Sequence, residues 1–223
     1  MDRDAILAQV RLQTLIETAN VSDADIVTLI NSGMQEISLA SEWPWLEASE
    51  NLSLVDSQQA YSLPTNFDFM VAIVDDDNDT TIPYMAPSEF FERYGNDTGN
   101  ESSQPTFYTI WEDQIYFTPI PSSNDTDRLT CYYYQTVTTL STGGSTPAFH
   151  AAFHQILVEY CKWKLWEREE YFDQSERAFI SFSRYMAQMQ SWYGRRAKRY
   201  PFIAGDGTFR RQGDPNLPWL RQV

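Results

Sequence analysis

Residues 22–47 carry apolar side chains at helical spacing. Ser22 precedes them and Asp25 follows three residues later, which is the pattern of a capping box at the start of a helix. Trp43-Pro44-Trp45 closes the segment, because proline removes a backbone donor and pushes the residue before it toward extended geometry. The pattern predicts an amphipathic helix with an aromatic exit. Its stripe comprises Ile26, Leu29, Ile30, Gly33, Ile37 and Ala40.

Helical spacing recurs in residues 3–18 and in two segments nearer the C-terminus. Thr146 and Pro147 suit the N-cap and first position of one of these, and Asp173, with Glu176 three residues on, suits the cap of the other. The spacing predicts a helical hairpin that ends near residue 198 and pairs with the helix that begins after Ser22 and stops at Pro44. Its apolar faces comprise Phe149, Phe153, Ile156, Tyr160 and Trp163, then Phe179, Phe182, Met186, Met189 and Tyr193.

Between these helical regions the period changes to that of strands. Strands are predicted at 51–55, 59–64, 67–74, 105–111, 114–121 and 128–136, with a short helix at 87–94 and a polar loop at 95–104. Glu112-Asp113 separates two of the strands as a hairpin turn. We therefore expect an α+β fold. Residues 1–47 and 146–199 form a helical bundle, residues 48–145 a β-rich insertion, and residues 200–223 an extended tail without regular structure.

The formal net charge of −15 is distributed unevenly along the chain. Residues 41–130 contain 17 acidic and two basic residues, whereas residues 194–223 contain two acidic and seven basic ones. An acidic middle repels phosphate, so nucleic-acid binding by the main body is disfavoured. The basic tail also carries apolar anchors at intervals, as segments that order on a partner do. The candidate partner-binding residues are Arg195, Arg196, Arg199, Phe202, Phe209, Arg210, Arg211, Leu217, Trp219 and Leu220.

Candidate catalytic chemistry is weak throughout the chain. His150 and His154 lie four residues apart, but alanines follow the first, where a metalloprotease motif requires glutamate, so structural histidines are the better reading. Cys131 and Cys161 form no metal or disulfide pattern and are expected to be buried core thiols. The paired acids Asp75, Asp76 and Asp77, and Glu112 and Asp113, are expected in solvated loops. We expect no cofactor, no metal, no signal peptide and no membrane-spanning segment.

Several sequence segments, taken in the order in which they occur along the chain, resemble the head-to-tail adaptor (connector) proteins of tailed bacteriophages. The resemblance covers roughly residues 20–195, and no single motif in it is as specific as a zinc or phosphate signature. The segments are DADIVTLINSGMQEISLASEWPWLE, the L-x-L…AYSLP-x-x-F segment at 52–67, QPTFYTIWEDQIYFTPIP at 104–121, LTCYYYQ at 129–135 and TPAFHAAFHQILVEYCKWKLWEREE at 146–170.

The resemblance implies a structural protein of the virion neck, synthesised in the host cytoplasm, and not an enzyme. It implies a homo-oligomeric ring of twelve copies beneath the portal protein, through which DNA passes without specific binding, and a platform for the tail nozzle or other tail proteins. The C-terminal tail would dock on the portal. Asp75, Asp76, Asp77, Glu112 and Asp113 are candidates for an acidic channel or rim, and Trp43, Pro44 and Trp45 for the joint between the two lobes. Two alternatives remain open: a hydrolase acting through paired acids, and a carbohydrate-binding tail module built on exposed tyrosines.

Overall fold

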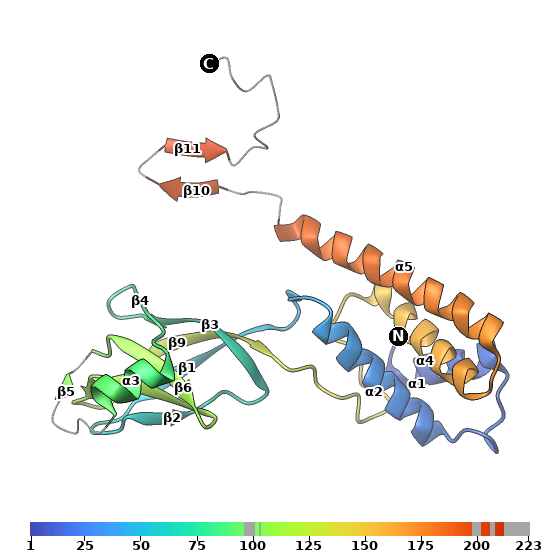
Figure 1. Ribbon diagram of the computed structural model, residues 1–223, viewed down its shortest axis with the longest axis horizontal. Helices are drawn as coiled ribbons and strands as arrows, with labels where there is room; N and C mark the ends of the chain where they lie inside the picture. The colour runs from blue at the N-terminus through green and yellow to red at the C-terminus, as the bar shows by residue number, and fades with distance from the viewer. Residues whose placement is uncertain (96–100, 103, 198–201, 206–207, 212–223) are drawn as a thin grey trace, which may run out of the picture.

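The chain folds as a mixed α+β protein in the computed structural model, which describes residues 1–95, 101–102, 104–197, 202–205 and 208–211. A helical part and a strand-rich part lie side by side, and the chain crosses between them twice (Figure 1). Each part has its own cluster of buried apolar side chains. The elements are α1 (Arg3–Thr14), α2 (Asp23–Leu39), β1 (Glu47–Leu54), β2 (Ala60–Ser62), β3 (Phe67–Asp75), β4 (Thr80–Ile82), α3 (Pro87–Tyr94), β5 (Glu101–Ser102), β6 (Phe107–Trp111), β7 (Gln114–Thr118), β8 (Ile120–Pro121), β9 (Asp125–Gln135), the 3₁₀ turn η1 (Ala151–Phe153), α4 (Gln155–Arg168), α5 (Phe172–Ala197), β10 (Phe202–Gly205) and β11 (Thr208–Arg211).

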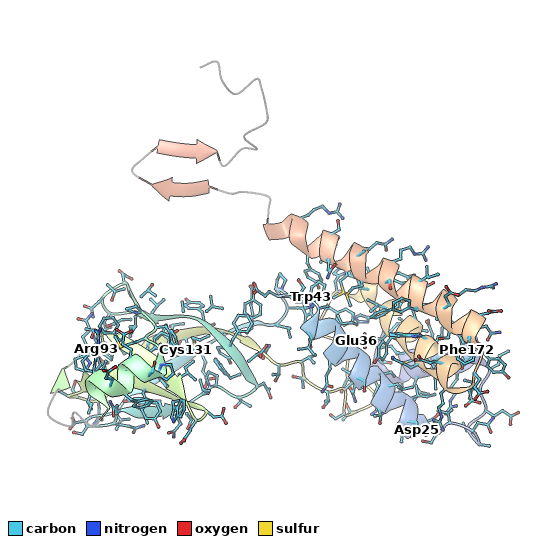
Figure 2. All side chains as sticks on the ribbon, viewed as in Figure 1. Asp25, Glu36, Trp43, Arg93, Cys131 and Phe172 are labelled. Carbon is cyan, nitrogen blue, oxygen red and sulfur yellow. The ribbon has the colours of Figure 1, made fainter. Side chains whose placement is uncertain are left out.

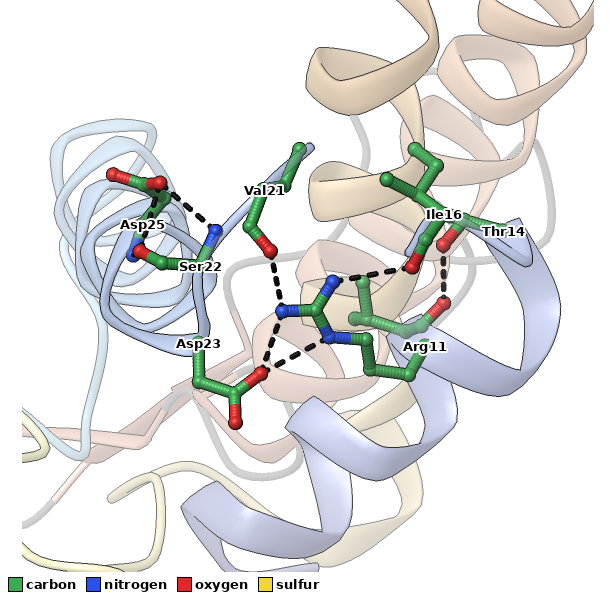
Figure 3. A network of polar contacts seen from close by, with 8 residues as sticks. Arg11, Thr14, Ile16, Val21, Ser22, Asp23 and Asp25 are labelled. Carbon is green, nitrogen blue, oxygen red and sulfur yellow. Dashed lines mark hydrogen bonds and ion pairs between the residues drawn. The ribbon is translucent and has the colours of Figure 1, made fainter. Parts of the chain in front are cut away.

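A single arginine ties the end of α1 to the start of α2 (Figure 3). The guanidinium of Arg11 donates to the carbonyl of Val21 at 2.6 Å, to the carbonyl of Ile16 at 3.2 Å and to the carboxylate of Asp23 at 2.6 and 3.0 Å. The carbonyls of Ile16 and Val21 lie in the connection between the two helices, where no helical hydrogen bond satisfies them. The side chain of Arg11 therefore links α1 to the connection and to the first turn of α2.

The capping box predicted at the start of α2 is confirmed. Ser22 Oγ accepts from the backbone N–H of Asp25, and the Asp25 carboxylate accepts from the backbone N–H of Ser22. The helix ends at Leu39, a few residues before the predicted stop at Pro44, and Ala40, predicted in its apolar stripe, is its exposed C-cap. The buried face comprises Ile26, Ile30, Gly33, Met34 and Ile37.

The predicted hairpin of α4 and α5 is present, but both of its starting positions are wrong. Thr146 and Pro147 lie outside helix, and η1 begins only at Ala151. Phe149 is buried in the helical cluster, and His150, in extended conformation, caps η1 by accepting from the N–H of Ala152. The second helix starts at Phe172, so Asp173 lies in its first turn and is not its cap.

The strand-rich part contains two main antiparallel sheets, with strand orders β1-β9-β3-β4 and β2-β7-β6. The predicted hairpin around Glu112 and Asp113 joins β6 to β7, and both turn residues have positive φ. The predicted helix at 87–94 is confirmed as α3. Several strand predictions need correction: β1 begins at Glu47, the strand predicted at 114–121 is divided into β7 and β8, and β9 already begins at Asp125. A short strand, β5, lies within the expected loop at 95–104.

The C-terminal segment contains a hairpin of β10 and β11, so the prediction of a tail without regular structure is wrong for these strands. Ile203 pairs with Arg210, and Ala204 pairs with Phe209. Phenylalanine, isoleucine and threonine favour strands, and the intervening sequence contains Asp-Gly, which is typical of hairpin turns. The hairpin stands apart from both parts of the body (Figure 1).

Candidate functional site

The Trp-Pro-Trp segment lies between α2 and β1 and packs on the helical part. Trp43 is 1% exposed, and its Nε1 donates to the carbonyl of Ile37 at 2.6 Å. Its ring lies 6.3 Å from the ring of Trp45 and 5.6 Å, edge-on, from that of Tyr193 on α5. Figure 2 places Trp43 where the helical part approaches the strand-rich part. Trp45 contacts Phe149 at 5.6 Å between ring centroids.

The two tryptophans differ in how their indole nitrogens are satisfied. Nε1 of Trp43 is bonded, whereas Nε1 of Trp45 is buried and has no hydrogen-bond partner among the described residues. A buried donor without a partner costs free energy. Both rings belong with the helical cluster, so they close its edge at the position where the chain leaves for β1. Their role in setting an angle between lobes stays a prediction.

A groove of about 600 Å³ opens beside this segment, and we call it the junction groove. Leu39, at the end of α2, is 86% exposed, and Phe69 on β3 stacks on Tyr134 of β9 at 4.7 Å between ring centroids. Glu42 and Asp68 add carboxylates to the groove lining, and the hydroxyl of Tyr134 donates to the carboxylate of Glu47 at 3.2 Å. The groove is lined by Ser38, Leu39, Ala40, Ser41, Glu42, Leu46, Asp68, Phe69 and Tyr134.

The expectation that Asp75 contributes to a solvated acidic surface is wrong. Asp75 is fully buried, and Arg128, itself 8% exposed, donates to its two carboxylate oxygens at 3.2 and 3.0 Å. Burial raises the pKa of Asp75, but hydrogen bonds from Arg128 and Asn78 outweigh it and hold the pKa below its ordinary value. The side chain is a structural anchor at the end of β3 and cannot face a channel.

The other predicted acids are exposed. Asp76 and Asp77 lie in the turn between β3 and β4, and Glu112 and Asp113 form the turn between β6 and β7. Each pair sits on an open turn, without the apolar pocket that separates the pKa values of an acid and a base in a hydrolase. Their suitability for a channel or rim remains a proposal.

The triple tyrosine of β9 is mainly a packing feature, as predicted. Tyr133 is 6% exposed within the strand-rich cluster, and Tyr134 stacks on Phe69. Tyr132 lies on the face of the sheet opposite to Tyr133 and is 45% exposed. Of the three tyrosines only Tyr132 is exposed, so this run of tyrosines does not form a row of stacking platforms for sugars or bases.

The candidate tail residues fall into three groups. Arg195 is exposed near the end of α5, and Arg196 lies in the same helix. Phe202 belongs to β10, and Phe209, Arg210 and Arg211 belong to β11, where backbone pairing alone is described. The remaining members, Arg199, Leu217, Trp219 and Leu220, lie outside the described residues.

The sequence reading missed a line of arginines on α5, which we call the arginine stripe. Arg177, Arg184 and Arg195 are all exposed and are separated by seven and eleven residues, close to two and three helical turns. They therefore share one side of the helix. The sequence signal was present: the spacing of seven and eleven residues places charged side chains on one exposed side of a helix, just as helical spacing places apolar side chains on its buried side.

The histidines and cysteines have structural surroundings. His154 is 4% exposed, and its Nε2 lies 3.0 Å from the carbonyl of Phe149. Burial lowers the pKa of His154. Cys131 and Cys161 are free buried thiols, as predicted; burial, with Glu50, raises the pKa of Cys131 to about 12, and burial raises that of Cys161. Neither is a nucleophile in these surroundings.

Over residues 1–95, 101–102, 104–197 and the C-terminal hairpin, no group of three or more histidine, cysteine or acidic side chains could hold a metal ion. Among the helices in the same part of the chain, none is long and apolar enough to cross a membrane.

Comparison with known proteins gives one positive result. The family model described as SU10 adaptor protein matches residues 1–205, which includes the helical part, the strand-rich part and β10. No curated protein matches the chain. The family match extends beyond the segments on which the sequence resemblance rests, at both ends.

Proposed function

The chain belongs to the SU10 adaptor protein family, and on this premise we propose that it is the head-to-tail adaptor of a tailed bacteriophage virion. The match over residues 1–205 carries the proposal, since it spans both parts of the fold. In this role the protein assembles into a ring of about twelve copies beneath the portal protein. The ring extends the DNA channel and presents a platform for nozzle or other tail proteins. The function is structural, with no catalytic step.

The architecture supports such a role in one specific way. Helices gather into a bundle-like part, and the strand-rich part projects from it as a separate body with its own buried cluster (Figure 1). A subunit of two bodies can use one for contacts within the ring and the other for contacts with the tail. In that arrangement the segment at 43–45 is the joint between them.

The proposed channel is acidic. The exposed turn acids Asp76, Asp77, Glu112 and Asp113 repel phosphate, so DNA passes without releasing counterions and without being held. Neutralising all four with the amides Asn and Gln is expected to leave a ring that slows DNA ejection and retains duplex DNA at low salt. Equal DNA retention by wild-type and neutralised rings would contradict the proposed lumen.

The C-terminal segment is the proposed portal contact. Deleting residues 200–223 removes most of the basic and apolar anchors and leaves the described helices intact. We expect a folded truncated protein, judged by circular dichroism, that no longer binds the purified cognate portal in sedimentation. The matched control keeps the length and replaces residues 200–223 with a Gly/Ser segment. If the truncated protein still sediments with portals, the tail is not the contact.

A further inference from the structure

We propose that the junction groove of one copy receives the arginine stripe of a neighbouring copy. This inference rests on the proposed ring and names the two surfaces of this chain that hold adjacent subunits together. Both surfaces consist of described residues, and they come from different regions: the end of α2 with β3 and β9 on one side, and the outer face of α5 on the other.

The groove combines apolar surface with negative charge that the chain leaves uncompensated. Leu39 is 86% exposed and Phe69 is 40% exposed, large values for apolar side chains next to a concavity. Glu42 and Asp68 line the groove, and both are exposed. Within the described part of the chain, neither carboxylate forms an ion pair. An apolar concavity with an acidic border fits a partner that carries cations on long aliphatic stems.

The arginine stripe has that chemistry. Arg177, Arg184 and Arg195 extend over about 27 Å of α5, from a rise of 1.5 Å per residue. None of the three has an ion-pair partner among the described residues; Arg184 lies 5.8 Å from the ring centroid of Tyr185, and Nε of Arg195 donates to the carbonyl of Ser191. Ile180, 59% exposed, lies one turn from Arg177 and Arg184 and supplies an apolar contact within the stripe.

The partner is a second copy because the two surfaces complement each other and occupy different places on the molecule. The chain carries −15 overall, so free cations in an exposed row on its longest described helix are unusual for it. Contact between two different patches is heterologous, which is the type of contact that generates closed rings. A two-fold dimer would have to join groove to stripe twice within one interface, once in each direction.

The test uses charge reversal on each surface of the full-length protein. Arg184→Glu and Glu42→Arg are expected to weaken self-association at least about ten-fold at low salt, measured by sedimentation equilibrium and native mass measurement. Leu39→Ser tests the apolar part, and its exposure predicts no loss of monomer stability. Arg168→Glu on α4 and Glu92→Arg on α3 are matched controls, because both side chains are exposed and lie outside the two surfaces.

Mixing the two reversed proteins distinguishes this contact from any other. In an equimolar mixture the intact groove of Arg184→Glu meets the intact stripe of Glu42→Arg, and the two reversed surfaces also carry opposite charges. The mixture is therefore expected to assemble with the two variants alternating, whereas neither variant assembles alone. Combining both reversals in one chain is expected to restore assembly. Stripe variants that assemble like wild type but lose salt-sensitive retention of duplex DNA would overturn the proposal and assign the stripe to DNA.

The paired surfaces can be refuted without refuting the adaptor role. Rings that form normally from all of the variants would overturn the paired surfaces and leave the adaptor role intact. A wild-type protein that assembles neither alone nor on the cognate portal would overturn the ring itself, and the inference with it.

Discussion

Gly33 offers the most direct test of how the helices pack. It lies on α2 against the ring of Tyr160 on α4, and a Cβ added there would meet Cδ1 of that ring at 2.7 Å and Cγ at 3.1 Å. Tyr160 is 5% exposed and is held by ring contacts with Trp163 at 5.7 Å and Phe182 at 5.6 Å. Because the ring cannot turn aside freely, Gly33→Ala must shift α2 away from α4.

Two opposing effects set the magnitude. Inserting a methyl group into a filled core costs about 1–3 kcal/mol, whereas replacing glycine by alanine inside a helix gains about 0.5–1 kcal/mol. We therefore expect Gly33→Ala to lower the free energy of unfolding by about 1–2 kcal/mol. For a chain of this size the melting temperature would fall by roughly 2–8 °C.

The matched control is Gly194→Ala on α5, where a Cβ meets nothing within 4 Å. The same substitution there should raise the free energy of unfolding by about 0.5–1 kcal/mol, since only the helix propensity changes. Urea denaturation followed by circular dichroism measures both variants. If Gly33→Ala proves as stable as Gly194→Ala, the close approach of α2 to Tyr160 is not a feature of the folded protein.

The remaining predictions concern charge and the tryptophans. The pKa of Asp75 is lower in the folded protein than its ordinary value of 3.8, so the ionised side chain contributes its full stabilisation above pH 3.8 and loses it as the pH falls through the folded pKa. The urea midpoint of unfolding should therefore fall between about pH 6 and about pH 2, and this fall should be smaller in Asp75→Asn. Arg128→Met leaves Asp75 buried without its ion pair and should cost about 3–5 kcal/mol at neutral pH, and a cost near zero would show that the carboxylate finds water. Trp43→Phe should cost more than Trp45→Phe in the same assay, since only Trp43 loses an indole hydrogen bond; equal costs would contradict the assigned roles. Trp45→Ala should weaken ring assembly more than it weakens either part's fold, and a comparable loss of both would make Trp45 ordinary core.

Features that depend on neighbouring residues were predictable from sequence. The capping box of Ser22 and Asp25, the helix at 87–94 and the hairpin turn at Glu112 and Asp113 all result from side chains and backbone within a few residues of each other. The burial of Met189 and Tyr193 on α5 also follows from helical spacing. In each case the local preference and the tertiary packing agree.

Features that depend on distant residues were not predictable. Asp75 begins an acidic run that looks solvated, and its burial depends on Arg128, 53 residues later. Phe149, just before η1, is buried and packs against Trp45, a residue far away in the sequence, so local spacing does not reveal where α4 starts. The junction groove exists because Phe69 pairs with Tyr134 across β3 and β9, a register that the sequence does not reveal.

Ring assembly and the geometry between the two parts are coupled if the junction groove is a subunit contact. Backbone bonds already bridge the crossing point, where the N–H of Gln135 donates to the carbonyl of Leu46 at 2.9 Å. The groove adds side chains from both parts, Glu42 from the helical side and Asp68 from the strand-rich side. An arginine stripe bound across both carboxylates stabilises only those angles that bring them within its reach. The contact favours one angle between the two parts only to the extent that the stripe binds more tightly at that angle than at others. Ring formation would then also select the orientation in which the strand-rich part is presented to the tail.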